Sequence, residues 1–374
     1  IPVAKGHDAA NLPASRGLLV VRTSAAGEDN PEVAEAARRG VPCVRRGEAL
    51  AMLARTCATP VCVSGSHGKT SISASLAFLL DRLGRNPGVL IGGRVPGWNR
   101  NGSPGDGGLF VAEADESDGT HALLSCALGI VPNVDDDHAW SVGGRTCLER
   151  NFQTFASNSK KLLYVASETT DRLFGNHPCA VRMTPDVPSG FLPGRGDFQR
   201  LDAWIALRAA ELLGVSRAEA EAALAEFPGV DRRLSLRYDG AATVMEDYAH
   251  HPVELRESLR SLRTLHPGKR LIVVFQPHRY ARLERYFNDF AEILTQADAL
   301  FVLPVFAAWT SSGTRSAKDL AARAGGVALD GTWDAMADAV AAVLKKGDLV
   351  AVIGAGDSAN LPPLLIRRIR RMEQ

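Results

Sequence analysis

A glycine-rich loop between an apolar run and a helical pattern constrains the fold of this chain most strongly. Residues 60–63, Pro-Val-Cys-Val, predict a buried strand, and residues 71–83 have the periodicity of a helix. Between them stands Gly65-Ser66-His67-Gly68-Lys69-Thr70. The backbone N–H groups of a loop in this position bind phosphate oxygens at the helix N-terminus. The pattern therefore predicts an α/β fold with a nucleotide phosphate site.

Two residues of this loop have specific expected roles. Lys69 would reach the β- and γ-phosphates, and the hydroxyl of Thr70 would hold Mg²⁺. The common pattern G-x-x-x-x-G-K-[ST] has glycine at position 63, where this chain has Val63, so the loop is a variant. The alternative is a glycine-rich turn with an incidental lysine, which the flanking strand and helix disfavour.

Acidic residues follow the next predicted strands. Glu113 comes directly after the strand 109–112, and ligands of parallel sheets bind at the carboxyl ends of strands. A hard cation such as Mg²⁺ takes a few oxygen ligands together with phosphate. We therefore predict Glu113 as a metal ligand. The acids at 115–118 and 135–137 have the alternative interpretation of a solvated loop, and His138, just past the strand 128–131, that of a structural histidine.

Two polar clusters follow strands in the last third of the chain. Strands predicted at 243–245, 271–275, 299–303 and 349–353 alternate with helices at 252–262, 281–295, 317–324 and 333–344, which implies a parallel sheet with covering helices. The clusters are residues 246–252, Glu-Asp-Tyr-Ala-His-His-Pro, and residues 275–282, Phe-Gln-Pro-His-Arg-Tyr-Ala-Arg. Arg279 and Arg282 are three apart, so both can face one anion. One such cluster could be a basic surface turn, but two at strand ends of one sheet indicate a site.

Composition excludes several classes of protein. The 374 residues suggest two or three domains, and 43 Lys and Arg against 42 Asp and Glu give a net charge of +1. Such a chain is not built to coat nucleic acid, so any anion must be held by a local site. It has no apolar run of about 18 residues, the length that a transmembrane helix needs, and no visible signal peptide. Six cysteines without a C-x-x-C pair predict reduced thiols and a cytoplasmic location.

Four motifs, in this order, resemble those of the Mur ligase family. They are residues 66–70 (Ser-His-Gly-Lys-Thr), 113–118 (Glu-Ala-Asp-Glu-Ser-Asp), 247–252 (Asp-Tyr-Ala-His-His-Pro) and 275–280 (Phe-Gln-Pro-His-Arg-Tyr). Residues 6–11 and 29–32 resemble the first domain of the same family. The resemblance implies an α/β fold in three domains. These are a partial N-terminal UDP-binding Rossmann-like domain (1–58), a central ATP-binding P-loop domain (59–228) and a C-terminal Rossmann-like ligase domain (229–374).

The resemblance also implies a reaction and a set of site residues. ATP and Mg²⁺ would activate the carboxylate of UDP-N-acetylmuramate as an acyl phosphate, and the amine of L-alanine would attack it, in peptidoglycan precursor synthesis. The implied protein is cytoplasmic, a monomer or homodimer, with neither nucleic acid nor membrane as partner. The implied residues are Lys69, His251, His278, Arg279 and Arg282 for catalysis, Gly65, Ser66, His67, Gly68, Lys69, Thr70, Ser71, Gln199 and Asp202 for the nucleotide, and Thr70, Glu113 and His138 for the metal.

The chain departs from the family pattern at three places. The nucleotide turn of the first domain would lie upstream of Ile1, so we expect a segment that precedes it. Gln199 and Asp202 stand where the family has a His-Asn pair and a later Asn. In the third domain the family usually has an acid after the strand on the alanine side, and residues 306–310 contain none. Three alternatives stay open: a related ligase for another amino acid or a preformed peptide, a catalytically silent binding protein, and a generic P-loop NTPase. The last explains Lys69 and Glu113 but leaves the two later clusters without a role.

Overall fold

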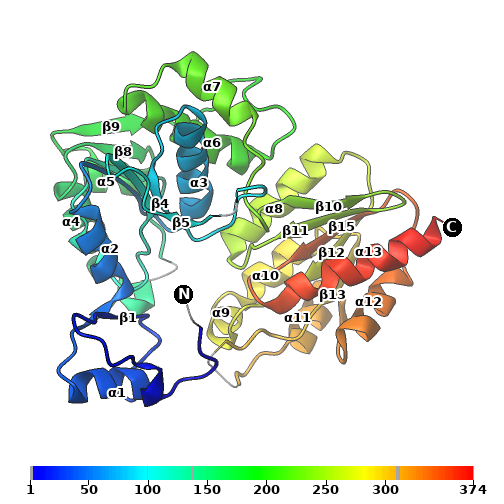
Figure 1. Cartoon of the computed structure of the whole chain (residues 1–374). Coiled ribbons are helices and arrows are strands. Elements are labelled where there is room, and N and C mark those ends of the chain that lie inside the picture. Colours follow the sequence, from blue (N-terminus) through cyan, green and yellow to red (C-terminus); the bar gives the residue numbers. More distant parts are fainter. Residues whose placement is uncertain (1–2, 99, 137–138, 309–311, 374) are drawn as a thin grey trace. The chain divides into compact units, whose positions relative to one another are not determined.

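The chain forms two compact units (Figure 1). The computed structural model describes residues 3–98, 100–136, 139–308 and 312–373. Unit 1 comprises residues 1–92, 100–186 and 205–224, and unit 2 comprises residues 93–99, 187–204 and 225–374. Helix α6 (Asp197–Leu212) contributes residues to both units.

A seven-stranded sheet forms the centre of unit 1, with the strand order β5-β4-β6-β3-β7-β8-β9. The strands are β3 (Thr59–Val63), β4 (Gly88–Leu90), β5 (Gly102–Ser103), β6 (Leu109–Glu113), β7 (Leu128–Val131), β8 (Leu162–Val165) and β9 (Ala180–Met183). All neighbours pair in parallel except β4 and β5. The helices of this region are α3 (Lys69–Arg82), α4 (Arg145–Ser157), α5 (Glu168–Phe174) and α7 (Arg217–Ala225). Because β3, β7 and β8 are almost completely buried, their sequences are nearly continuous apolar runs.

The N-terminal part of unit 1 is a small αβ layer. Its two strands, β1 (Val20–Arg22) and β2 (Cys43–Arg45), pair in parallel. Helix α1 (Pro31–Arg38) begins as the sequence predicts, with Asn30 accepting hydrogen bonds from the N–H groups of the first turn. Helix α2 (Arg46–Ala54) approaches the 3-10 helix η2 (Thr120–Leu123) so closely that a Cβ at Gly47 would lie 1.7 Å from Thr120 Oγ1. Only glycine permits this contact.

Unit 2 contains a six-stranded sheet in the order β10-β11-β15-β12-β13-β14, parallel except for β10 and β11. The strands are β10 (Ser235–Asp239), β11 (Thr243–Asp247), β12 (Leu271–Phe275), β13 (Ala299–Val302), β14 (Val327–Ala328) and β15 (Leu349–Ile353). The helices are α8 (Pro252–Leu265), α9 (Tyr280–Arg285), α10 (Phe287–Leu294), α11 (Ala317–Ala324), α12 (Trp333–Ala341) and α13 (Leu361–Met372). Alternate residues of β12 enter two separate cores, Val273 in one and Val274 in the other, so helices cover both faces of the sheet.

The predicted α/β fold and its strands are confirmed, and the differences are local. The predicted helix 281–295 is two helices, α9 and α10, because Tyr286 leaves helical geometry (φ −112°, ψ 25°) and packs its ring against His251. Sequence patterns gave no prediction for α2, α4, α5, α7 or α13. In the described part of the chain no helix is long and apolar enough to cross a membrane.

Candidate active site

The phosphate-binding loop connects β3 to α3, as the sequence predicts. Gly68 has φ +81°, a left-handed conformation that favours glycine, immediately before the helix begins at Lys69. At Gly65 an added Cβ would lie 2.9 Å from Pro132 Cδ and 3.0 Å from the carbonyl oxygen of Asn133. Glycine is therefore required at 65 by close packing and at 68 by backbone geometry.

Lys69 lies inside the loop and is surrounded by carboxylates. Its Nζ donates to the carbonyl oxygens of Gly65 (2.6 Å) and Ser66 (3.2 Å) and forms an ion pair with Glu116 Oε2 (2.9 Å). Burial lowers the pKa of Lys69, but the nearby carboxylates outweigh burial and raise it overall, so the ammonium stays charged. Burial raises the pKa of Glu116 to about 7, although the Lys69 ammonium opposes that shift.

Thr70 and Glu113 form the oxygen-rich part of the site. Thr70 Oγ1 donates to Glu113 Oε2 at 2.8 Å, and Glu113 Oε2 also accepts from the N–H of Gly92 at 2.9 Å. A hydroxyl and a carboxylate at the start of a phosphate-binding helix are the donors that Mg²⁺ takes beside phosphate and water, so these residues fit that ion. The described residues hold no group of three or more His, Cys, Asp and Glu side chains that could bind a metal. His138, the third expected ligand, lies outside the described residues.

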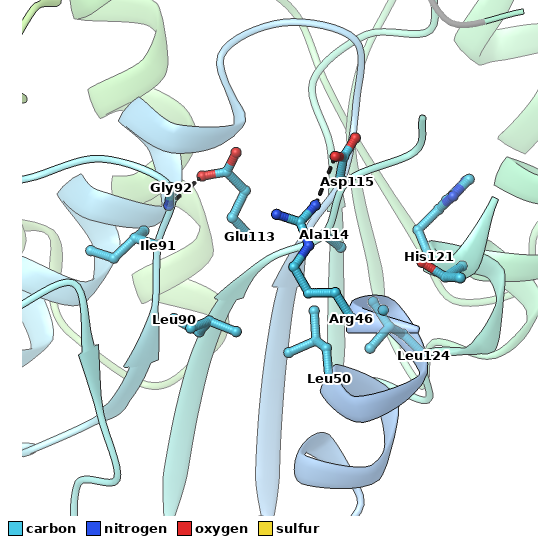
Figure 2. Close-up of a pocket in the computed structure, with 12 residues that line it drawn as sticks. Arg46, Leu50, Leu90, Ile91, Gly92, Glu113, Ala114, Asp115, His121 and Leu124 are labelled. Carbon is cyan, nitrogen blue, oxygen red and sulfur yellow. Dashed lines mark hydrogen bonds and ion pairs between the residues drawn. The ribbon is translucent and has the colours of Figure 1, made fainter. Parts of the chain in front are cut away.

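A pocket of about 190 Å³ opens beside Glu113 in unit 1 (Figure 2). Arg46 of α2 reaches across it to Asp115 in an ion pair of 2.9 Å. Its remaining lining is mostly apolar or glycine: Gly47, Leu50, Leu90, Ile91, Gly92, Ala114, Leu124, with Thr120 and His121. Because Glu113 both lines the pocket and contacts Thr70, a molecule held here would lie beside the phosphate loop.

The structure brings together several residues of the two predicted clusters in unit 2. His278 Nδ1 lies 3.1 Å from Arg282 Nη1, and its ring stacks on Phe306 with centroids 5.6 Å apart and planes at 9°. The ring of His250 lies 5.5 Å from that of His278. Arg279 has φ +67°, unusual for a residue with a side chain, and its N–H donates to the Phe306 carbonyl oxygen at 2.8 Å. Arg282 and two imidazoles thus gather beyond the end of β12, and Arg279 directly follows His278 in the chain.

Of the adjacent histidines, His250 rather than His251 joins this cluster. His251 is the N-cap of α8: its Nδ1 accepts from the N–H of Val253 at 3.4 Å, and its ring packs 4.7 Å from that of Tyr286. The sequence held a usable signal, because Pro252 at the first helical position and Glu254 two residues later mark His251 as the cap. Its predicted catalytic role stays a prediction.

Tyr248 extends the cluster, and sequence reasoning had given it no role. The guanidinium carbons of Arg232 and Arg233 lie 5.0 and 5.1 Å from the centroid of its ring, and its ring makes an edge contact with His250 at 5.5 Å. The sequence gives no signal for this contact, because Arg232 lies before β10 and Tyr248 follows β11, and no local pattern joins these two segments.

The two expected adenine-side residues lie on α6 in unit 2. Gln199 Oε1 accepts from the N–H of Gly196 at 3.1 Å, and its Nε2 donates to the carbonyl oxygen of Arg233 at 3.0 Å. Asp202 is buried. The amide of Gln199 therefore serves a local contact within unit 2, and nucleotide binding by Gln199 and Asp202 stays a prediction.

Comparison with known proteins identifies the class of protein that this fold and these residues define. Residues 232–356 match the family description "Mur ligase, glutamate ligase domain", and residues 1–57 match "Mur ligase family, catalytic domain". Together with curated relatives that are 33–35% identical over 95–99% of the chain, these matches show that the chain belongs to the Mur ligase family.

Curated relatives give a more particular likeness. The chain is 33% identical to the UDP-N-acetylmuramate–L-alanine ligase of Burkholderia orbicola, with 99% of this chain and 88% of the relative covered. It is 35% identical to the protein of the same name from Maricaulis maris (95% and 84% covered) and 34% identical to that of Streptomyces coelicolor (98% and 87%).

Solved structures share the fold. The UDP-N-acetylmuramate–alanine ligase of Thermotoga maritima superimposes with a TM-score of 0.82 at 24% identity, covering 98% of this chain and 88% of that one. A MurF ligase of the same organism, solved with ADP, gives a TM-score of 0.66 at 19% identity and covers 94% and 95%. At these identities the likeness shows the three-domain fold alone.

Proposed function

We propose that this chain is an ATP-dependent ligase that joins L-alanine to UDP-N-acetylmuramate during synthesis of peptidoglycan precursors in the cytoplasm. The observation that carries the proposal is the contact of Thr70 with Glu113 at the start of the phosphate-binding helix, beside a pocket. Relatives 33–35% identical over 95–99% of the chain bear the name of that activity. We also propose that the protein acts as a monomer or a homodimer.

The phosphate loop would act in the first half of the reaction. The muramate carboxylate attacks the γ-phosphorus of ATP, ADP leaves, and an acyl phosphate forms. Lys69 and the N–H groups at the start of α3 bind the phosphate oxygens and stabilise charge that moves to the β-phosphate. Thr70 and Glu113, with His138 from the sequence, would hold Mg²⁺, which neutralises phosphate charge when bound.

The cluster in unit 2 would act in the second half. The amine of alanine attacks the acyl carbon, the tetrahedral intermediate loses phosphate, and the amide remains. Arg279 and Arg282 supply the positive charge that an amino-acid carboxylate or the departing phosphate needs. His278, held by Arg282 and stacked on Phe306, orients that charge, and His250 lies against it.

The test is release of phosphate from ATP with Mg²⁺ and UDP-N-acetylmuramate, measured against a panel of amino acids and short peptides. Release that requires both the nucleotide sugar and L-alanine is the expected result. Release with another amine would keep the chemistry and replace the amino acid. If no amine supports release while ADP still binds, the chain is a silent binding protein, and the proposal is wrong.

A further inference from the structure

The first half of the phosphate loop is bound to a neighbouring segment of unit 1. Asn133, two residues after β7, holds both polar groups of the His67 backbone: its Oδ1 accepts from the N–H of His67 at 2.8 Å, and its Nδ2 donates to the carbonyl oxygen of His67 at 3.2 Å. The side-chain amide thus pairs with the His67 backbone as a neighbouring strand would. Two hydrogen bonds from one side chain fix the orientation of that part of the loop.

Ser66 and Asp135 extend the same pairing. The N–H of Asp135 donates to Ser66 Oγ at 2.8 Å, and Ser66 Oγ lies 3.3 Å from the Asp135 carbonyl oxygen. The N–H of Ser66 is directed to the carbonyl oxygen of Asn133 at 3.4 Å, and His67 Nε2 lies 3.3 Å from Asp135 Oδ2. We call this set of contacts, residues 66–67 with residues 133–135, the loop clasp.

The clasp determines which N–H groups the loop can offer to a nucleotide. The N–H of Ser66 is directed to the carbonyl oxygen of Asn133 and that of His67 donates to Asn133 Oδ1, so both are already engaged within the protein. The first N–H groups of α3, which starts at Lys69, have no carbonyl partner within the helix and point out of its N-terminus. The phosphate cradle therefore consists of the turn from Gly68 into the first residues of α3.

The structure also accounts for the variant sequence of the loop. In the common pattern a glycine stands at position 63, but here Val63 is a buried residue of β3 that pairs with Glu113 and Ile130. Val63 belongs to the strand rather than to the loop, so position 63 does not need a glycine's backbone freedom. Glycine is required instead at Gly65, which packs against Pro132.

We infer that Asn133 is a positioning residue of the nucleotide site, because its side-chain amide fixes the His67 backbone and so restricts the phosphate cradle to the turn at Gly68 and the start of α3. The inference rests on the nucleotide-binding part of the proposed function. It does not depend on which amine the enzyme uses.

The experiment measures MgADP affinity by calorimetry in the full chain. Asn133→Ala should weaken binding about tenfold, because loss of the clasp releases the loop to conformations that do not bind phosphate. Ser66→Ala removes the two hydroxyl contacts with Asp135, leaves the side-chain bonds of Asn133 in place and should weaken binding several-fold. Asn158→Ala is the matched control: it deletes an asparagine whose Nδ2 bonds the carbonyl oxygen of Ala122 in the same unit, and MgADP affinity should not change.

A second readout separates positioning from general destabilisation. In steady-state turnover Asn133→Ala should raise KM for ATP while KM for the nucleotide sugar stays within about twofold, whereas a weakened fold would lower the active fraction and leave both KM values unchanged. Unaltered MgADP affinity in Asn133→Ala and Ser66→Ala would overturn the inference and leave the proposed function standing. Failure of the wild-type chain to bind MgADP would overturn both.

Discussion

The phosphate loop of unit 1 and the polar cluster of unit 2 differ in the groups that surround their cations. Around the loop one cation, Lys69, is in the field of Glu113, Asp115 and Glu116. In the cluster of unit 2, Arg282 instead lies against the imidazole of His278, which in turn contacts that of His250. Carboxylates beside a phosphate site suit a phosphate that arrives together with a cation, whereas arginines beside imidazoles suit an anion that arrives without one. The difference supports our proposal of a metal–nucleotide site in unit 1 and an anion-orienting site in unit 2.

Lys69→Ala tests the loop and should give the largest effect. The ammonium group of Lys69 lies inside the phosphate loop, so loss of this charge should lower turnover by roughly a thousandfold. Phosphate release measures this, and circular dichroism should show an unchanged fold. Turnover near the wild-type value would remove the phosphate-binding assignment from the loop.

Arg279→Ala tests the other side of the comparison. Its charge is expected to act on the reacting groups rather than on ATP in the ground state, so kcat should fall by roughly a hundredfold with little change in KM for ATP. Arg285→Ala is the matched control on the neighbouring helix α9, where Arg285 lies over the ring of Tyr286. A rise in KM for ATP with kcat unchanged would show that Arg279 binds the nucleotide instead.

The adjacent histidines sharpen the role of unit 2. His250→Ala should lower kcat by about tenfold, because His250 packs against His278 at the cluster. His251→Ala should instead lower the free energy of unfolding by about 1 kcal/mol, through loss of the α8 cap, with a smaller effect on kcat. Chemical denaturation and turnover are measured on both variants. The reverse pattern would support the catalytic role that the sequence predicts for His251.

Local patterns in the sequence predicted the phosphate loop and the strand end that carries Glu113. A buried strand, two glycines and a helix predicted the loop, and the position of Glu113 at the end of β6 placed it beside Thr70. The loop prediction depends on consecutive residues, and the Glu113 prediction depends on parallel strands that end at one edge of a sheet.

The rest of the site depends on contacts between distant segments. No spacing predicts that Glu116 pairs with Lys69, or that the side chain of Asn133 binds the backbone of His67. His250 and His251 are adjacent in the chain, and only the structure shows that His250 contacts His278 while His251 caps α8. Tyr286 interrupts the predicted helix 281–295 for a tertiary reason, its packing against His251.

A buried histidine of unit 1, His121, shows what an imidazole does without the partners that His250 and His278 have in unit 2. It is 1% exposed, its two ring nitrogens have no hydrogen-bond partner, and its ring centroid lies 4.7 Å from that of Phe152. Burial lowers the pKa of His121 to about 4. His250 and His278, by contrast, contact Glu254 and Arg282. His121 therefore packs as a neutral ring, and its polarity opposes folding.

His121→Phe should therefore stabilise unit 1, and increasingly so in acid. At pH 7 the gain is about 1 kcal/mol, from removal of unpaired nitrogens. Below the ordinary pKa of 6.5 the unfolded wild-type chain binds a proton that the folded chain refuses until about pH 4, so wild-type stability falls as pH decreases through this range. The phenylalanine variant lacks that loss, and the difference between the two proteins should widen by about 3 kcal/mol at pH 4. Urea unfolding between pH 4 and 8 measures it; a difference independent of pH would mean that the buried imidazole is paired or protonated in the fold.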